Sequence, residues 1–125
     1  MTPAPKVYNA AVHGWDIHVD VRVGEGQVGS MMINGEAIAG NAGRYHKNLG
    51  KAAALLNEDI VINADVAHVT VESPRASIVA EVCLMGPAGT DMEDPSFKLG
   101  AQVYVDQGVF QPDKVARLGM RIRVR

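Results

Sequence analysis

The segment Trp15-Asp16-Ile17-His18-Val19-Asp20-Val21-Arg22-Val23 alternates without interruption between apolar and polar side chains. Because successive side chains of a β-strand point to opposite faces of a sheet, this period of two places the apolar residues on one face and the polar residues on the other. A strand with one dry face and one hydrated face is typical of antiparallel sheets. The segment therefore predicts a strand over residues 15–23 whose apolar face contributes to a hydrophobic core.

The composition of the whole chain favours strands in the same way. Of the 125 residues, 47% are hydrophobic and 21% are charged, which is too apolar for a disordered protein. Val and Ile far outnumber Leu, and these β-branched side chains are stiff and pack well on a pleated surface. The length suits one domain covering residues 1–125, large enough to bury a core without disulfides.

Turn residues divide the rest of the chain into short apolar segments. Asn34-Gly35 predicts a type I′ hairpin, and His13-Gly14 predicts a second hairpin that leads into the strand over 15–23. Helical spacing of Leu and Ala predicts one short helix near residues 51–56, and Pro112 predicts a helical turn that ends near Leu118. Further strands are expected over residues 6–12, 28–33, 36–39, 60–71, 76–85, 97–105 and 120–125.

Seven or eight short strands separated by turns predict a mainly all-β fold, an antiparallel β-sandwich with at most one short helix. A small β-barrel is the alternative, but aromatic residues make up only 5% of the chain, which is few for a barrel that encloses a ligand. The segment 76–85 is apolar on both faces and is therefore expected to be a central strand.

Charge and cysteine content restrict the class of partner. Twelve basic and fourteen acidic residues give a net charge of −2, so nucleic acid is not an expected partner, and no apolar stretch is long enough to cross a membrane. The single Cys83 lies in an apolar segment and is expected to be a buried hydrophobic residue. With no N-terminal signal segment, the chain is expected to be cytoplasmic, or exported by a route that needs none.

The polar face of the strand over 15–23 supplies candidate metal ligands. Asp16, His18 and Asp20 lie on this face, with His13 close by in sequence, and same-face neighbours on a strand are about 6.6–7 Å apart. Ordinary alternation of a half-buried strand explains the same residues, so metal-dependent catalysis or small-ligand binding here, with His13 or His68, is the alternative hypothesis. The sequence contains no complete catalytic motif and points to no cofactor.

Two basic segments and one acidic segment are candidate partner-binding sites. Six residues separate Gly43 from Gly50, where a phosphate loop has four, and Ala52 lacks the hydroxyl that would meet magnesium. This segment is therefore interpreted as a basic cluster in a loop or at a helix start, which could bind an anion or an acidic protein surface. The candidate residues are Arg44, Lys47 and Lys51 in this cluster, Arg121, Arg123 and Arg125 in the last strand, and Asp91, Glu93 and Asp94 in an acidic loop.

The arginines of the last strand are either paired within their own sheet or exposed on an edge that meets an acidic partner. The acidic loop lacks the ligand spacing of a calcium loop, but its charge is opposite to that of the arginines, so the two could meet in neighbouring copies. These features predict a non-enzymatic protein-interaction or self-assembling structural module, most simply a symmetric homo-oligomer. Weak binding of nucleic acid or another polyanion through 44–51 and 121–125 is a further alternative.

Overall fold

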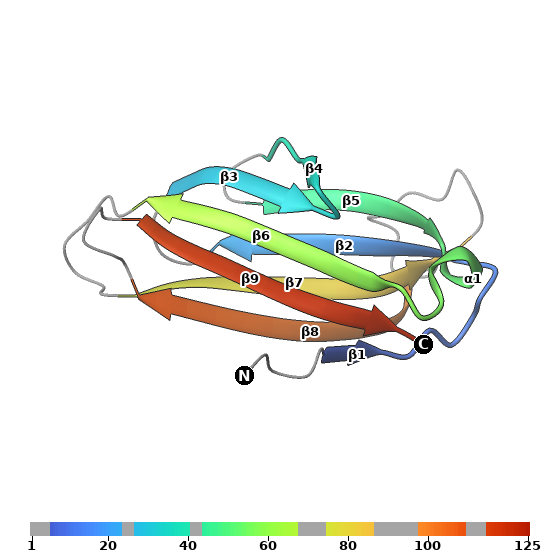
Figure 1. Cartoon of the computed structure of the whole chain (residues 1–125). Helices are drawn as coiled ribbons and strands as arrows, with labels where there is room; N and C mark the ends of the chain where they lie inside the picture. Colours follow the sequence, from blue (N-terminus) through green and yellow to red (C-terminus); the bar gives the residue numbers. More distant parts are fainter. Residues whose placement is uncertain (1–5, 24–26, 41–43, 68–74, 87–97, 110–114) are drawn as a thin grey trace.

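The computed structural model describes residues 6–23, 27–40, 44–67, 75–86, 98–109 and 115–125. These residues form two sheets that face each other, which confirms the predicted β-sandwich (Figure 1). Neighbouring strands are antiparallel, except that β1 runs parallel to β9. The first sheet has the order β1 (Lys6–Tyr8), β9 (Val115–Val124), β6 (Asp59–Ala67), β3 (Gln27–Ile33) and β4 (Glu36–Ala37), and the second has β5 (Arg44–Lys51), β2 (Asp16–Val23), β7 (Arg75–Met85) and β8 (Lys98–Val109).

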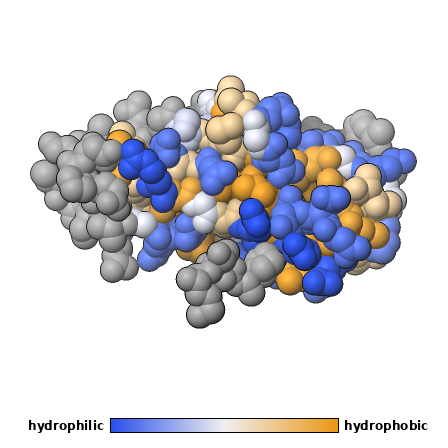
Figure 2. All heavy atoms as spheres, in the orientation of Figure 1, coloured by the Kyte–Doolittle hydropathy of each residue, from blue (hydrophilic) through white to orange (hydrophobic). Residues whose placement is uncertain are grey.

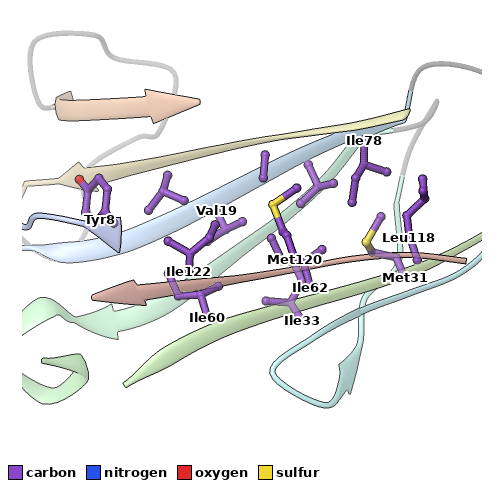
Figure 3. Close-up of a cluster of buried hydrophobic side chains, with 14 of the residues drawn as sticks. Tyr8, Val19, Met31, Ile33, Ile60, Ile62, Ile78, Leu118, Met120 and Ile122 are labelled. Atoms are coloured by element: carbon purple, nitrogen blue, oxygen red, sulfur yellow. The ribbon is translucent and has the colours of Figure 1, made fainter. Parts of the chain in front are cut away.

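The core lies between the two sheets and is made of alternate residues of the long strands. Ile17, Val19 and Val21 of β2 are fully buried, as their alternation predicts. Figure 3 shows Val19 and Ile78 of one sheet facing Ile62 and other apolar side chains of the second sheet. Burying each side chain of this size contributes roughly 1.5–3 kcal/mol, so this layer is the main source of stability.

Strand β7 occupies the centre of its sheet between β2 and β8, as its two apolar faces predict. Ile78, Val82 and other alternate residues point into the core. Cys83 and Met85 lie on the opposite face, and both are almost completely buried as well.

The predicted Asn34-Gly35 hairpin is confirmed as the connection between β3 and β4. Both residues have positive φ, 52° and 78°, as a type I′ turn requires. Asn34 also fixes the turn to the neighbouring strand, because its side-chain oxygen accepts a hydrogen bond from the Val61 amide at 2.8 Å.

The predicted His13-Gly14 hairpin is wrong. Strand β1 pairs with β9 in one sheet, whereas β2 lies in the other, so the chain crosses between layers after β1 instead of folding back. The Ala10 amide donates to the Arg125 carbonyl at 2.7 Å during this crossing. Ala10 and Val12 pack against the core, and this burial explains why their pattern is like that of a strand.

Two further segments are strands where other structure was expected. Residues 44–51 form β5 and not a loop, with only α1 (Ala52–Leu55) helical, inside the predicted range 51–56. The alternation of β5 is hidden in the sequence because Lys47 points inward and a bulge shifts the register before Gly50. Residues 115–119 belong to β9 and not to a helical turn, since Ala116 and Leu118 continue the buried row of that strand.

The expected strand over 60–71 corresponds to β6, and its end at 68–71 lies outside the described residues. The helix in the described part of the chain, with four residues, is far too short to cross a membrane.

Candidate functional site

The outer face of the sheet β5-β2-β7-β8 brings together polar side chains of β5, β2 and β7. We call this set the polar face. Because strand pairing places directly opposite residues on the same side of a sheet, the register aligns it in rows. The rows from β5 through β2 to β7 are Arg44, Arg22 and Val79; His46, Asp20 and Glu81; Asn48, His18 and Cys83; and Lys51, Asp16 and Met85.

Two histidines meet diagonally across the polar face. Nδ1 of His18 lies 3.0 Å from Nε2 of His46, and the ring centroids are 5.0 Å apart at an interplanar angle of 27°. The two residues are 28 positions apart in sequence. Pairing of β5 with β2 brings them together, and the sequence carries no signal for that pairing.

The pKa values of both histidines are lowered. For His18 the main cause is burial, followed by the nearby charge of His46, while Asp16 acts in the opposite direction. For His46, which is exposed as a whole residue, the main cause is the partial burial of its side chain, opposed by Asp20 and by a hydrogen bond with the Val19 backbone. Both rings are therefore neutral near pH 7, when each has one N–H donor and one lone pair. One ring donates to the other in their contact.

The carboxylates of β2 are paired with side chains of the same face. Asp20 is only 7% exposed and accepts a hydrogen bond from Nη2 of Arg44 at 3.2 Å, with Nε of Arg22 at 3.9 Å. Asp16 accepts a hydrogen bond from Asn48 Nδ2 at 3.1 Å. A buried carboxylate needs such partners, so these contacts stabilise the fold and occupy groups that looked available in the sequence.

Next to the histidines, Cys83 shares a row with His18. Burial raises the pKa of the Cys83 thiol, and the charge of Lys98, which forms an ion pair with Glu81, opposes this effect. The group is therefore a thiol and not a thiolate near neutral pH, and it is 1% exposed. It has neither the ionisation nor the access of a catalytic nucleophile.

The predicted metal ligands are only partly brought together. Asp16, His18 and Asp20 share the polar face, whereas His13 lies in the turn before β2, where its carbonyl accepts a hydrogen bond from the Ala53 amide at 2.9 Å. Within the described ranges, no three His, Cys, Asp or Glu side chains are arranged to hold a metal ion. His68 lies outside these ranges.

The basic cluster of β5 does not form one patch. Arg44 lies on the polar face with Asp20, whereas Nζ of Lys47 lies on the other side of the strand, 2.7 Å from Oε2 of Glu36. Lys51 is exposed at the end of β5. Two of the three predicted cations therefore have carboxylate partners within the chain.

The arginines of the last strand are also largely paired. Strand β9 lies between β1 and β6, so the edge-strand interpretation is wrong. Arg123 donates to both carboxylate oxygens of Asp59, at 2.8 and 3.3 Å, and Arg121 Nε lies 3.6 Å from the same carboxylate. Hydrogen bonding to Arg123 lowers the pKa of Asp59. Arg125 is exposed at the chain end, and the acidic residues Asp91, Glu93 and Asp94 lie outside the described residues.

A second surface, which the sequence did not reveal, follows the side of the sandwich formed by β1 and β8. Strand β8 pairs with β7 alone among the described strands, so its second edge has no strand partner there. We call this strand with its exposed apolar side chains the β8 edge. Among the described residues, the large hydrophobic side chains that are exposed are Val103 at 57%, Val105 at 48%, Val7 at 42%, Leu99 at 40% and Met32 at 37%.

Three of these five exposed side chains belong to β8, whereas Val7 of β1 lies beside Arg123 on the outer side of the other sheet and Met32 lies on β3. On the face that Figure 2 draws, hydrophobic and hydrophilic residues are interleaved, as expected for strands with one hydrated side. The β8 edge thus differs from a scatter of single apolar residues, because neighbouring positions of one strand are exposed together.

Two tyrosines hold β1 against β8. The hydroxyl of Tyr8 donates to the Gly100 carbonyl at 2.9 Å, and the hydroxyl of Tyr104 donates to the Val7 carbonyl at 2.7 Å. Further along, the Gly119 amide of β9 donates to the Asp106 carboxylate at 3.1 Å. Side chains thus close this side of the sandwich, without a continuous ladder between the two sheets.

Comparison with protein-family models, with curated proteins and with solved structures finds no match to this chain. Any functional conclusion therefore depends on the geometry of the polar face and the β8 edge.

Proposed function

We propose that this protein is a non-enzymatic interaction module that associates with a second copy of itself through the β8 edge. The observation that carries the proposal is the concentration of exposed apolar side chains on a long strand that has one strand neighbour among the described residues. Edge strands with free backbone groups pair readily with another chain, and apolar side chains add to the contact.

An antiparallel, two-fold symmetric pairing centred on Tyr104 fits the side-chain pattern of β8. In that register Val103 of each copy lies opposite Val105 of the other, and the contact is self-complementary, as a symmetric dimer requires. Val103 and Val105 share the outer side of the sheet, since they pair with Glu81 and Val79 of β7. Apolar cross-strand pairs of this kind contribute about 0.2–1 kcal/mol each, so we expect a reversible dimer.

The pairing of charges within the chain supports an apolar contact over a charged one. Arg44, Lys47 and Arg123 each face a carboxylate of their own chain, which weakens their attraction for a polyanion or an acidic partner. Exposed Arg and Lys residues with internal partners gain little by exchanging them for external ones.

Sedimentation velocity over a concentration series reaching tens of micromolar tests this proposal. We expect a monomer–dimer equilibrium that persists when the salt concentration of the experiment is raised to about 1 M, because salt screens charge pairs but strengthens apolar contacts. The double substitution Val103→Lys with Val105→Lys places like charges opposite each other in the proposed register and should leave only monomer.

Met32→Lys is the matched control, because Met32 is an exposed apolar strand residue away from β8. It should leave the dimer intact. A wild-type protein that stays monomeric throughout the series, or a dimer that Met32→Lys disrupts equally, would contradict the proposal. A dimer that salt dissociates would instead favour contact between charged segments.

A further inference from the structure

The contact between His18 and His46 has the spacing of a chelating pair as well as that of a hydrogen bond. Two ligand nitrogens bound to one ion at about 2.0–2.1 Å are roughly 2.8–3.0 Å apart at a right angle and roughly 3.3–3.4 Å apart at a tetrahedral angle. The observed separation of 3.0 Å is at the upper end of the right-angle range. To bind one ion, the two rings would rotate from this contact so that both lone pairs point toward the ion.

We propose that His18 Nδ1 and His46 Nε2 form a two-histidine site for a divalent transition metal ion such as Zn²⁺ or Cu²⁺. Imidazole nitrogen is the protein ligand that both ions commonly use. Two protein ligands leave the other coordination positions to water, so the site is expected to bind the ion exchangeably. The proposal does not depend on self-association through the β8 edge.

Apart from rotation of the rings, metal binding at this site requires only a change of tautomer. Each neutral ring keeps its single proton on the other nitrogen, Nε2 of His18 and Nδ1 of His46, so no ring has to ionise. Because Nε2 of His46 faces His18, Nδ1 is the nitrogen left for the hydrogen bond with the Val19 backbone. Such an outer contact orients a ligating ring and fixes its tautomer.

The charges around the site favour a cation on one side and oppose it on another. The carboxylates of Asp16 and Asp20 interact electrostatically with His18 and His46 respectively. The guanidinium of Arg44 partly neutralises Asp20. His18 is half-buried and His46 is exposed, so an ion can reach the nitrogens from solvent.

Isothermal titration of the whole protein with Zn²⁺ alone tests the site. We expect one ion per chain for the wild type and a loss of affinity of at least about tenfold for His18→Gln and for His46→Gln, since even the loss of an outer-sphere partner costs that much. His13→Gln is the matched control, because His13 lies in the turn before β2, and it should leave binding unchanged.

Electron paramagnetic resonance of the Cu²⁺-loaded wild type gives an independent readout that needs no variant to fold. Its nitrogen splittings should report two imidazole ligands, and the signal should change to one imidazole in His46→Gln. Zn²⁺ binding that survives both substitutions would overturn the proposal, as would loss of binding in His13→Gln. Loss of Zn²⁺ binding in Cys83→Ser would assign the ion to the thiol beside His18 and would also overturn it.

Discussion

Strands β2 and β8 belong to the same sheet, but their outward-facing side chains are in different environments. β2 has a neighbour on each side, and its polar residues are engaged: Asp20 with Arg44, and His18 with His46. β8 has one described neighbour and exposes Val103 and Val105. The polar groups that look reactive in the sequence are thus largely satisfied within the chain, whereas ordinary valines provide the open surface.

The position of a strand in its sheet explains this difference. A central strand has polar side chains of its neighbours within reach, so Asp20 and Asp16 of β2 find partners on β5 at 3.2 and 3.1 Å. An edge strand lacks these neighbours on one side, and its side chains remain exposed whatever their polarity. Candidate sites chosen from residue type alone therefore overlook the exposed apolar side chains of β8, and the sheet order is needed to find them.

The largest expected effect separates the two strands by stability. Ile17→Ala on β2 removes a fully buried side chain from the core and should lower the free energy of unfolding by roughly 2–5 kcal/mol. Val105→Ala on β8 truncates a side chain that is 48% exposed and should change it by less than about 0.5 kcal/mol. Urea denaturation of both variants, followed by circular dichroism, measures the comparison.

If Val105→Ala lowers the free energy of unfolding as much as Ile17→Ala does, then Val105 is buried in solution. Denaturation should therefore be repeated at low protein concentration, where a reversible dimer dissociates. A large loss of stability in Val105→Ala that remains at low protein concentration would contradict an open β8 edge. A loss of stability that disappears on dilution would support association.

The sequence predicted the sandwich because its long strands obey one simple rule. The buried rows of β2 and β7 repeat every second residue, and Asn34-Gly35 marks its turn by backbone preference alone. Strand β5 was missed because Lys47 occupies an inward position and a bulge interrupts the period. The hairpin predicted at His13-Gly14 failed because local turn preference does not determine which sheet a strand joins.

The candidate site was predictable only in part, for a related reason. Alternation places Asp16, His18 and Asp20 on one face, and this placement is correct. The partner His46 comes from another strand, and sequence spacing alone does not determine the register between strands. The exposure of β8 depends on sheet order, which is likewise set by contacts distant in the sequence.

A smaller effect concerns the tyrosines that hold β1 to β8. Tyr8→Phe keeps the buried ring but removes the hydroxyl that donates to the Gly100 carbonyl, and should lower the free energy of unfolding by about 1 kcal/mol.

Burial also raises the pKa of Tyr8 to about 12, so its phenol should ionise at higher pH than that of an exposed tyrosine in an alkaline absorbance titration. Tyr104→Phe is the matched variant at the more exposed end of the same contact and should cost less. Equal costs would mean that both hydroxyls are shielded from water to the same degree.

The smallest expected effect is a pH dependence that comes from His18 of β2 and its partner His46 of β5, and that is absent from β8. Because the folded protein lowers the pKa of His18 and His46, the unfolded chain binds protons more readily than the folded one. The contribution of these groups to stability is therefore complete above about pH 6.5, the ordinary histidine value, and is lost as the pH falls through the lowered folded values. The titratable and charged groups near the pair are Asp16 and Asp20, whose charges oppose the shift, Arg44 on β5, and Cys83 and Glu81 on β7. Urea denaturation at about pH 7.5 and at about pH 5.5 should show a loss of stability at the lower pH that is smaller in His46→Gln than in the wild type. Val103→Ala on β8 should lose as much as the wild type.

An equal loss of stability in His46→Gln and in the wild type would show that the two rings do not share a contact in solution, and would remove the basis for a chelating pair on the polar face.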